Sequence, residues 1–231
     1  AMIRCAARLR EQGLAPRVAP AFLNYSRPTL AETVARLAGQ GVSRIWVQPY
    51  FLIAGAYVQQ DLPVLVRRVA ADHPEIEFTT GEALGDHPAL VDLALARAQA
   101  VLGPAAPTRR GLLLMAHGTP LPAANAPLAE IAAAVARRGS FAHHTVAYLD
   151  CNAPDIPAGL ADLAAAGAAQ IVALPYFLHL GRHVAEDLPR LVAQTAAALP
   201  QVRIAQAQHL GYDPRLVDAL AARIAPETDT T

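Results

Sequence analysis

Short apolar runs alternate with longer stretches of helical periodicity in the second half of the chain. The runs are apolar throughout rather than alternating, which is typical of parallel strands buried on both faces. In chain order the predicted elements are strand 111–116, helix 126–138, strand 145–149, helix 154–166, strand 170–174, helix 183–199, strand 202–205 and helix 213–224. Strands that alternate with helices indicate βαβ units. Right-handed crossovers then place every strand-to-helix loop at one edge of the sheet.

The first half of the chain repeats this pattern at an offset of 126 residues. The segment PYFLIAGAYVQQDLP at 49–63 returns as PYFLHLGRHVAEDLP at 175–189. Repeated units fold alike, so the predicted elements of the first copy are strands 17–23, 44–48 and 76–80 and helices 1–13, 28–38, 59–71 and 88–100. The counterpart of strand 111–116 would fall before residue 1, so we expect the first strand of this copy to be missing.

The repeat predicts an α/β protein of two tandem lobes, each a parallel sheet with helices on both faces. We expect the first lobe at 1–103 and the second at 111–226, joined by a linker rich in Gly and Pro. With 231 residues and 54% hydrophobic content, the chain can bury a sizeable core.

Composition excludes several functional classes. Lys+Arg and Asp+Glu both number 19, so no net field favours nucleic acid or an anionic membrane. The apolar runs are far shorter than the roughly 20 residues that span a bilayer. Cys5 and Cys151 form no metal or redox motif, so we expect reduced core residues, with a disulfide as the alternative. No signal peptide is visible, and we expect a cytoplasmic protein.

Three polar residues of the second copy follow strands that share one edge: His117, Asp150 and His183. Ligands of open parallel sheets bind beyond the carboxyl ends of the strands. Two imidazoles and a carboxylate suit a divalent ion such as Co²⁺, Fe²⁺, Ni²⁺ or Zn²⁺. Equally, two imidazoles could accept and pass on protons near neutral pH.

Each of these residues also has a structural interpretation. A single His at a strand end is more often a hydrogen-bonded structural group, although Gly118 after His117 would let a ligand approach the backbone. Asp150 could cap the next helix, and His183 could be an exposed residue of a first helical turn. The first copy has Tyr57 at the position of His183 and Asn24 at that of Asp150. We therefore expect the reactive set in the second lobe.

Other candidates are weaker. His179, His209 and Arg182 also occur only in the second copy and could line the same cleft. Arg182 could bind a substrate carboxylate, but all three could equally be surface residues, and Glu186 could pair with Arg182. The aromatic pairs at 50–51 and 176–177 are interpreted first as core residues. Their predicted place at the mouth of the cleft would also allow a flat apolar ligand to pack against them.

The chain resembles the class II chelatases, specifically the sirohydrochlorin cobaltochelatase and ferrochelatase (CbiX-type) family. The resemblance rests on LLLMAHGTP with His117, on AYLD with Asp150, and on PYFLHLGRHVAEDLP with His183. The closing HLGYDPRLVDAL and its earlier twin ALGDHPALVDLA also fit. The resemblance covers essentially the whole chain, as an internally duplicated member.

The family implies two flavodoxin-like lobes with a cleft for a tetrapyrrole. It implies a lyase that inserts Co²⁺ or Fe²⁺ into sirohydrochlorin in cobalamin or siroheme biosynthesis, without an organic cofactor. By this resemblance His117 and His183 bind the metal and take pyrrole protons. Asp150 stands where members commonly have Glu. We expect a monomer. The alternatives are a non-catalytic tetrapyrrole or metal carrier on the same fold and, less specifically, a two-lobed periplasmic-type binding protein.

Overall fold

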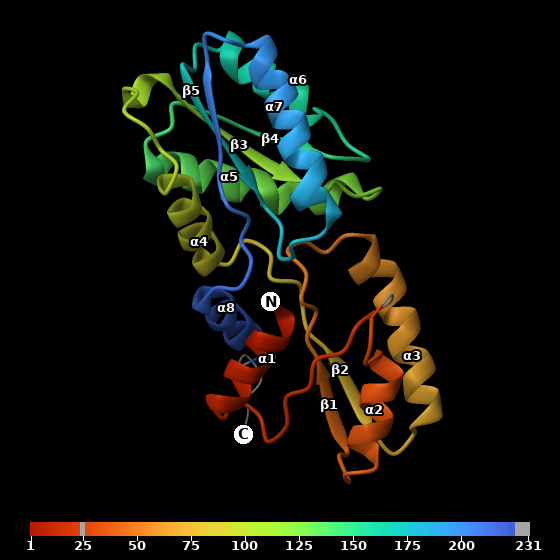
Figure 1. Cartoon of the computed structure of the whole chain (residues 1–231). Helices are drawn as coiled ribbons and strands as arrows, with labels where there is room; N and C mark the ends of the chain where they lie inside the picture. Colours follow the sequence, from red (N-terminus) through yellow and green to blue (C-terminus); the bar gives the residue numbers. More distant parts are fainter. Residues whose placement is uncertain (24–25, 225–231) are drawn as a thin grey trace. The chain divides into compact units, whose positions relative to one another are not determined.

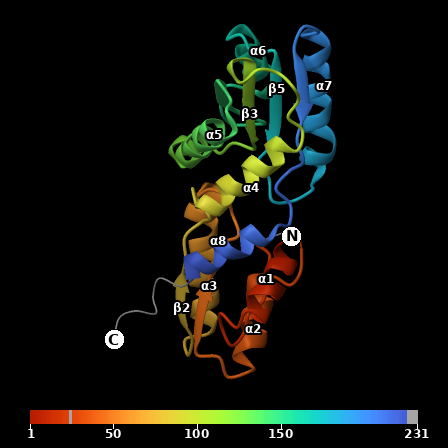
Figure 2. The ribbon, with the colours of Figure 1, turned by 90° about the vertical axis from the view of Figure 1, so that its left-hand side faces the viewer.

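The computed structural model describes residues 1–23 and 26–224, which form two compact units (Figures 1 and 2). One unit comprises Ala1–Gly85 and the segment from Leu216, and the other comprises Asp86–Arg215. The boundary between the compact units differs from the boundary between the two sequence copies. Helix α4 (Pro88–Gln99) belongs to the first copy but lies in the second unit. No helix in the described part is long and apolar enough to cross a membrane.

The second unit is built on a four-stranded parallel sheet of order β4-β3-β5-β6. Its strands are β3 (Arg110–Ala116), β4 (His143–Tyr148), β5 (Gln170–Pro175) and β6 (Arg203–Gln206). The predicted strands are thus confirmed within one or two residues. In the ladder, Ala116 pairs with Tyr148 and Met115 with Pro175. The loops after β3, β4 and β5 therefore start side by side at one edge.

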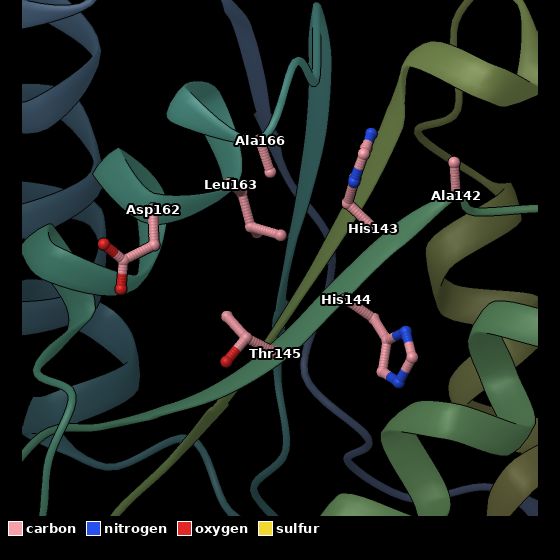
Figure 3. A pocket seen from close by; sticks show the side chains of 7 residues that line it. All are labelled: Ala142, His143, His144, Thr145, Asp162, Leu163 and Ala166. Atoms are coloured by element: carbon pink, nitrogen blue, oxygen red, sulfur yellow. The ribbon is translucent and has the colours of Figure 1, made fainter.

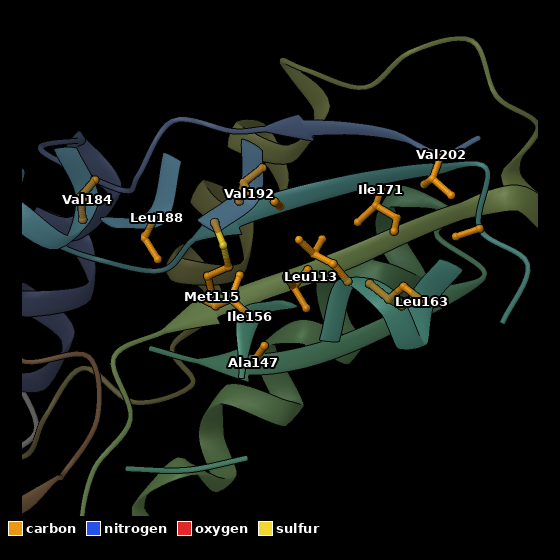
Figure 4. Close-up of a cluster of buried hydrophobic side chains, with 13 residues drawn as sticks. Leu113, Met115, Ala147, Ile156, Leu163, Ile171, Val184, Leu188, Val192 and Val202 are labelled. Carbon is orange, nitrogen blue, oxygen red and sulfur yellow. The ribbon is translucent and has the colours of Figure 1, made fainter. Parts of the chain in front are cut away.

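Helices cover both faces of this sheet. Helices α6 and α7 lie on one face, and α4 and α5 lie on the other (Figures 1 and 2). A buried cluster joins Leu113 and Ile171 of the strands to Leu163 and Leu188 of α6 and α7 (Figure 4). The bounds are 3₁₀ helix Pro107–Arg109, 3₁₀ helix Pro122–Asn125, α5 (Ala126–Gly139), α6 (Ile156–Ala165), the π-helix η4 (His183–Asp187) and α7 (Leu188–Ala198).

The first unit has a smaller sheet. Among the residues described, it holds two parallel strands, β1 (Arg44–Val47) and β2 (Glu77–Thr80). Its helices are α1 (Met2–Glu11), α2 (Leu30–Ala38), the π-helix η1 (Tyr57–Asp61), α3 (Leu62–Asp72) and α8 (Pro214–Ile224). Val34 of α2 and Val69 of α3 are central to its buried cluster.

The predicted strand at 17–23 is wrong. That segment makes only an isolated bridge, between Phe22 and Thr29. Its counterpart β4 is held by β3, whereas no strand among the described residues pairs with 17–23. A strand without a neighbour has nothing to satisfy its backbone groups, so this segment runs as an irregular connection.

Local structure recurs at the 126-residue offset despite the difference in sheet size. The π-helices start at Tyr57 and His183, and the bridge from Phe22 has its equivalent at Tyr148. The loops after the paired strands are also joined by equivalent donors. The Gly85 N–H donates to the Leu52 carbonyl, and the Gly211 N–H donates to the Phe177 carbonyl, one residue before the counterpart of Leu52. Side chains at equivalent positions therefore stand on similar local backbone.

Candidate functional site

The loop after β3 presents His117 and is held against the loop after β4. The backbone N–H of Asp150 donates to the His117 carbonyl at 2.9 Å. Gly118 has a φ of +93°, and a Cβ there would collide with the Asp150 carbonyl oxygen. The glycine therefore lets two backbones meet, which is a structural role; the approach of a ligand to the Gly118 backbone stays a prediction. This close contact fixes the position from which the His117 side chain projects.

Asn152 also joins these two loops, a role that the sequence alone did not indicate. Its Oδ1 accepts hydrogen bonds from Thr119 N–H at 2.8 Å and from the Asn125 side chain at 3.0 Å. One side-chain oxygen thus holds the loop that follows His117. No local motif signals this contact, because its partners are 27 and 33 residues away.

The structure brings His117 and His183 together. Their ring centroids lie 5.2 Å apart, and the rings meet edge to face at 77°. His117 directly follows the last residue of β3. His183 is the first residue of η4, which comes after the neighbouring strand β5. Both side chains are exposed. Two imidazoles that each bind one ion at about 2.1 Å in tetrahedral geometry have centroids roughly 5 Å apart. The observed pair therefore suits a shared divalent ion.

Asp187 fixes one nitrogen of His183. The His183 Nδ1 and the Asp187 Oδ2 lie 2.9 Å apart, one helical turn from each other. The hydrogen bond from His183 lowers the pKa of Asp187, and the charges of Arg182 and Arg190 act in the same direction. With Nδ1 engaged, Nε2 is the nitrogen left for a metal or a proton. The sequence carried a signal for this pair, a His and an Asp four apart at a helix start.

Asp150 does not cap the next helix, so that alternative is wrong. Asp155 is the N-cap of α6, and it accepts the Ala158 N–H at 2.8 Å. The Asp150 carboxylate instead accepts the N–H of Cys151 at 2.7 Å. Within the described ranges no group of three His, Cys, Asp or Glu is arranged to hold a metal. Asp150 as a third ligand stays a prediction.

The cysteine expectation is half right. Both cysteines are free; Cys5 is buried, whereas Cys151 is exposed in the loop after Asp150. Asn24, the first-copy counterpart of Asp150, lies outside the described residues.

The other candidates lie on neighbouring loops of the same edge. Arg182 pairs with Glu186 at 3.6 Å, both side chains being largely exposed, as the alternative interpretation expected. His179 follows β5 and His209 follows β6, on loops joined by the Gly211 N–H; we call these two the loop histidines. Desolvation is the main cause that lowers the pKa of both, although the His179 side chain is exposed and only that of His209 is half-buried. The charge of His209 adds to the effect on His179, and that of Arg97 adds to the effect on His209.

A hollow of about 390 Å³ lies at the opposite edge, between β4 and α6 (Figure 3). Its lining includes His143, His144 and Asp162. His143 and His144 are the first residues of β4 rather than a preceding loop. The hollow is therefore far along the sheet from the imidazole pair, at the ends where the strands begin.

The sequence model of the CbiX family matches residues 1–101 and 111–227. The chain belongs to the CbiX family. Among the relatives of this CbiX-family chain, a sirohydrochlorin ferrochelatase of Priestia megaterium is 26% identical over 88% of this chain and 75% of the relative. A sirohydrochlorin cobaltochelatase of the same organism is 23% identical over 87% of this chain and 66% of the relative.

The fold is that of a solved chelatase. SirB from Bacillus subtilis with Fe³⁺ superposes with a TM-score of 0.82 at 19% identity, over 96% of this chain and 86% of SirB. A cobalt complex of SirB from Bacillus subtilis subspecies spizizenii gives a TM-score of 0.79 at 19% identity, over 96% and 85%. These likenesses confirm the predicted class, a mixed α/β chain of two lobes with parallel sheets.

Proposed function

We propose that this CbiX-family protein is a sirohydrochlorin chelatase, a lyase that inserts Co²⁺ or Fe²⁺ into a sirohydrochlorin-type tetrapyrrole in cobalamin or siroheme biosynthesis. The observation that carries the proposal is the pairing of His117 with His183, 5.2 Å apart at the carboxyl edge of the second unit's sheet. Both relatives described above act, by name, on sirohydrochlorin. The metal is a substrate, and the reaction requires no organic cofactor.

Insertion must strip water from the ion and remove two N–H protons from the macrocycle. Two neutral imidazoles replace water in the coordination sphere and still release the ion, because imidazole suits several divalent metals without enclosing them. A nitrogen lone pair cannot hold a metal and a proton at once. When His183 or His117 releases the ion, the freed lone pair accepts a pyrrole proton as a general base.

Asp187 serves this step by position and charge. Its carboxylate holds the His183 ring in one orientation through Nδ1, as second-shell carboxylates do for metal-binding imidazoles. It also stabilises the imidazolium that forms when Nε2 accepts a proton. Asp187 thus orients the imidazole and stabilises its protonated form, and it does not itself bind the ion.

The remaining candidates have supporting roles in the proposal. Asp150 supplies a third ligand or a base by turning its carboxylate from the Cys151 N–H to the ion. Arg182 and the loop histidines bind carboxylates of the substrate, since sirohydrochlorin carries many, and Gly118 provides a backbone contact to the substrate beside His117. We further propose a tandem-duplicated protein of two lobes, 1–103 and 111–226, that works as a monomer in the cytoplasm.

The test is anaerobic insertion of Co²⁺ and Fe²⁺ into sirohydrochlorin, followed by absorbance. We expect the intact protein to exceed the spontaneous rate, and His183→Ala to lose on the order of 100-fold, the typical contribution of a general base. His144→Ala is the matched control, because it removes an exposed imidazole at the opposite edge. Tight binding of metal or tetrapyrrole without acceleration over the spontaneous rate would instead indicate a carrier.

A further inference from the structure

Tyr57 stands in the first copy where His183 stands in the second. Each is the first residue of a five-residue π-helix, followed directly by a long α-helix, α3 or α7. The Tyr57 side chain is 50% exposed. Few large hydrophobic side chains among the described residues are exposed to this extent. Large apolar surface left open in this way marks a contact site when it is part of a larger patch.

Tyr57 is part of such a patch, because it stacks on Phe51. The two ring centroids are 6.2 Å apart, and the ring planes differ by 24°. Phe51 lies in the loop after β1, whose backbone accepts an N–H from the loop after β2. The pair is thus carried on the carboxyl edge of the first unit's own sheet, the edge at which α/β sheets bind ligands.

The equivalent phenylalanine of the second copy is used differently. Phe177 packs against the buried cluster of its unit, and His183 turns to Asp187 and His117. On one shared local backbone, the second copy therefore builds an imidazole pair and the first builds a stacked aromatic pair. The first copy thus has a phenol at the position of the His183 imidazole, and this phenol is stacked on the ring of Phe51.

We propose that Tyr57 and Phe51 form an aromatic platform that stacks against the flat face of the tetrapyrrole. The inference rests on the proposed function, because it takes the substrate from there. A conjugated macrocycle offers a broad π-face, and aromatic side chains bind such faces by offset stacking while the area they share leaves water.

The test is equilibrium binding of metal-free sirohydrochlorin under anaerobic conditions, with no metal present. The single tryptophan of the chain, Trp46 in β1 of the same unit, reports binding through quenching of its fluorescence. Stacking on one aromatic side chain is worth about 1–3 kcal/mol for a nucleobase, so Tyr57→Ala should raise the Kd about tenfold or more. Tyr57→Phe keeps the ring and should stay within about twofold of the parent Kd.

Val64→Ala is the matched control, since Val64 is 49% exposed on α3 of the same unit and should leave the Kd unchanged. Circular dichroism and the unfolding midpoint verify that each variant is folded. A Kd of Tyr57→Ala within about twofold of the parent, or an equal loss in Val64→Ala, would overturn the platform and leave the chelatase proposal intact. If the parent protein does not bind the tetrapyrrole at all, the platform and the proposed function fail together. Binding that depends on Tyr57 without metal insertion would retain the platform and reject the enzyme.

Discussion

Replacing Asp187 by Asn tests whether the imidazole pair depends on its carboxylate. The Asp187 Oδ2 lies 2.9 Å from Nδ1 of His183, and the hydrogen bond to His183 is the main cause of its lowered pKa. An amide of the same shape retains the volume and removes the charge. Loss of such a partner typically costs about 10–100-fold in metal affinity or activity. We therefore expect Asp187→Asn to lose at least about tenfold in the rate of Co²⁺ insertion.

The assay is the anaerobic insertion rate at saturating sirohydrochlorin and limiting metal, measured between about pH 6 and 8. The lowered pKa means that the contribution of the carboxylate is present above the ordinary Asp range near 4 and is lost as the pH falls through the lowered value. In the assay window the parent carboxylate is therefore fully ionised, and the variant should be slower at every pH.

The first copy offers a matched control for this variant. Asp61 occupies the equivalent position at the end of η1. The residue four positions before it is Tyr57, whereas the residue four positions before Asp187 is a histidine. Asp61→Asn should keep the parent rate. An Asp187→Asn variant that inserts metal as fast as the parent would refute the reasoning. An equal loss in Asp61→Asn would refute it as well, because the effect would then belong to the helix start and not to His183.

Further predictions concern the scaffold of the site. Gly118→Ala should destabilise the protein by at least about 1–3 kcal/mol in urea unfolding, because φ is +93° and the new methyl meets the facing backbone carbonyl; a change below about 0.5 kcal/mol would contradict this. Asp213→Ala should cost about 0.5–2 kcal/mol at pH 7, the value of a helix cap, because the Asp213 carboxylate accepts the Arg215 backbone N–H. Burial opposes ionisation of Asp213, but hydrogen bonds from Arg215 lower its pKa overall, so the penalty should shrink as the pH falls through that lowered value; an equal penalty at about pH 3 and 7 would count against this. Burial also lowers the pKa of the half-buried His209, so its neutral form stabilises the fold above about pH 6.5, and this stability is lost as the pH falls through the lowered value. The variant His209→Gln should therefore lose less stability than the parent between about pH 7 and 5, and parallel pH curves would contradict the assignment.

The strands of the second unit could be predicted because each is an unbroken apolar run that must be covered on both faces. Leu112, Leu113 and Leu114 are fully buried in turn, which is the environment that such a run indicates. The segment at 17–23 failed because strand formation depends on a neighbour and not on the segment alone. The helix predicted at 183–199 was right in extent, but its first turn is a π-helix, which apolar spacing at 3.6 residues does not reveal.

At the site, shared topology predicted that His117 and His183 would meet, since both follow strands that pair in parallel. The contacts that fix them could not be predicted in the same way. Asn152 acts across loops distant in sequence, and the close approach at Gly118 is visible only when both backbones are placed. The contact between Asp187 and His183 could have been predicted from their spacing of four residues. It was missed because the first copy has an Asp at the same position, which suggested architecture rather than chemistry.

The central claim is that His117 and His183 act as one unit in metal insertion, and a double-mutant cycle tests it most directly. Anaerobic Co²⁺ insertion would be measured for the parent, His117→Ala, His183→Ala and the double variant. The account predicts that each single variant loses on the order of 100-fold and that the double variant loses little more, because groups acting in one step are strongly non-additive. Single variants that retain the parent rate, or losses that simply multiply in the double variant, would contradict it.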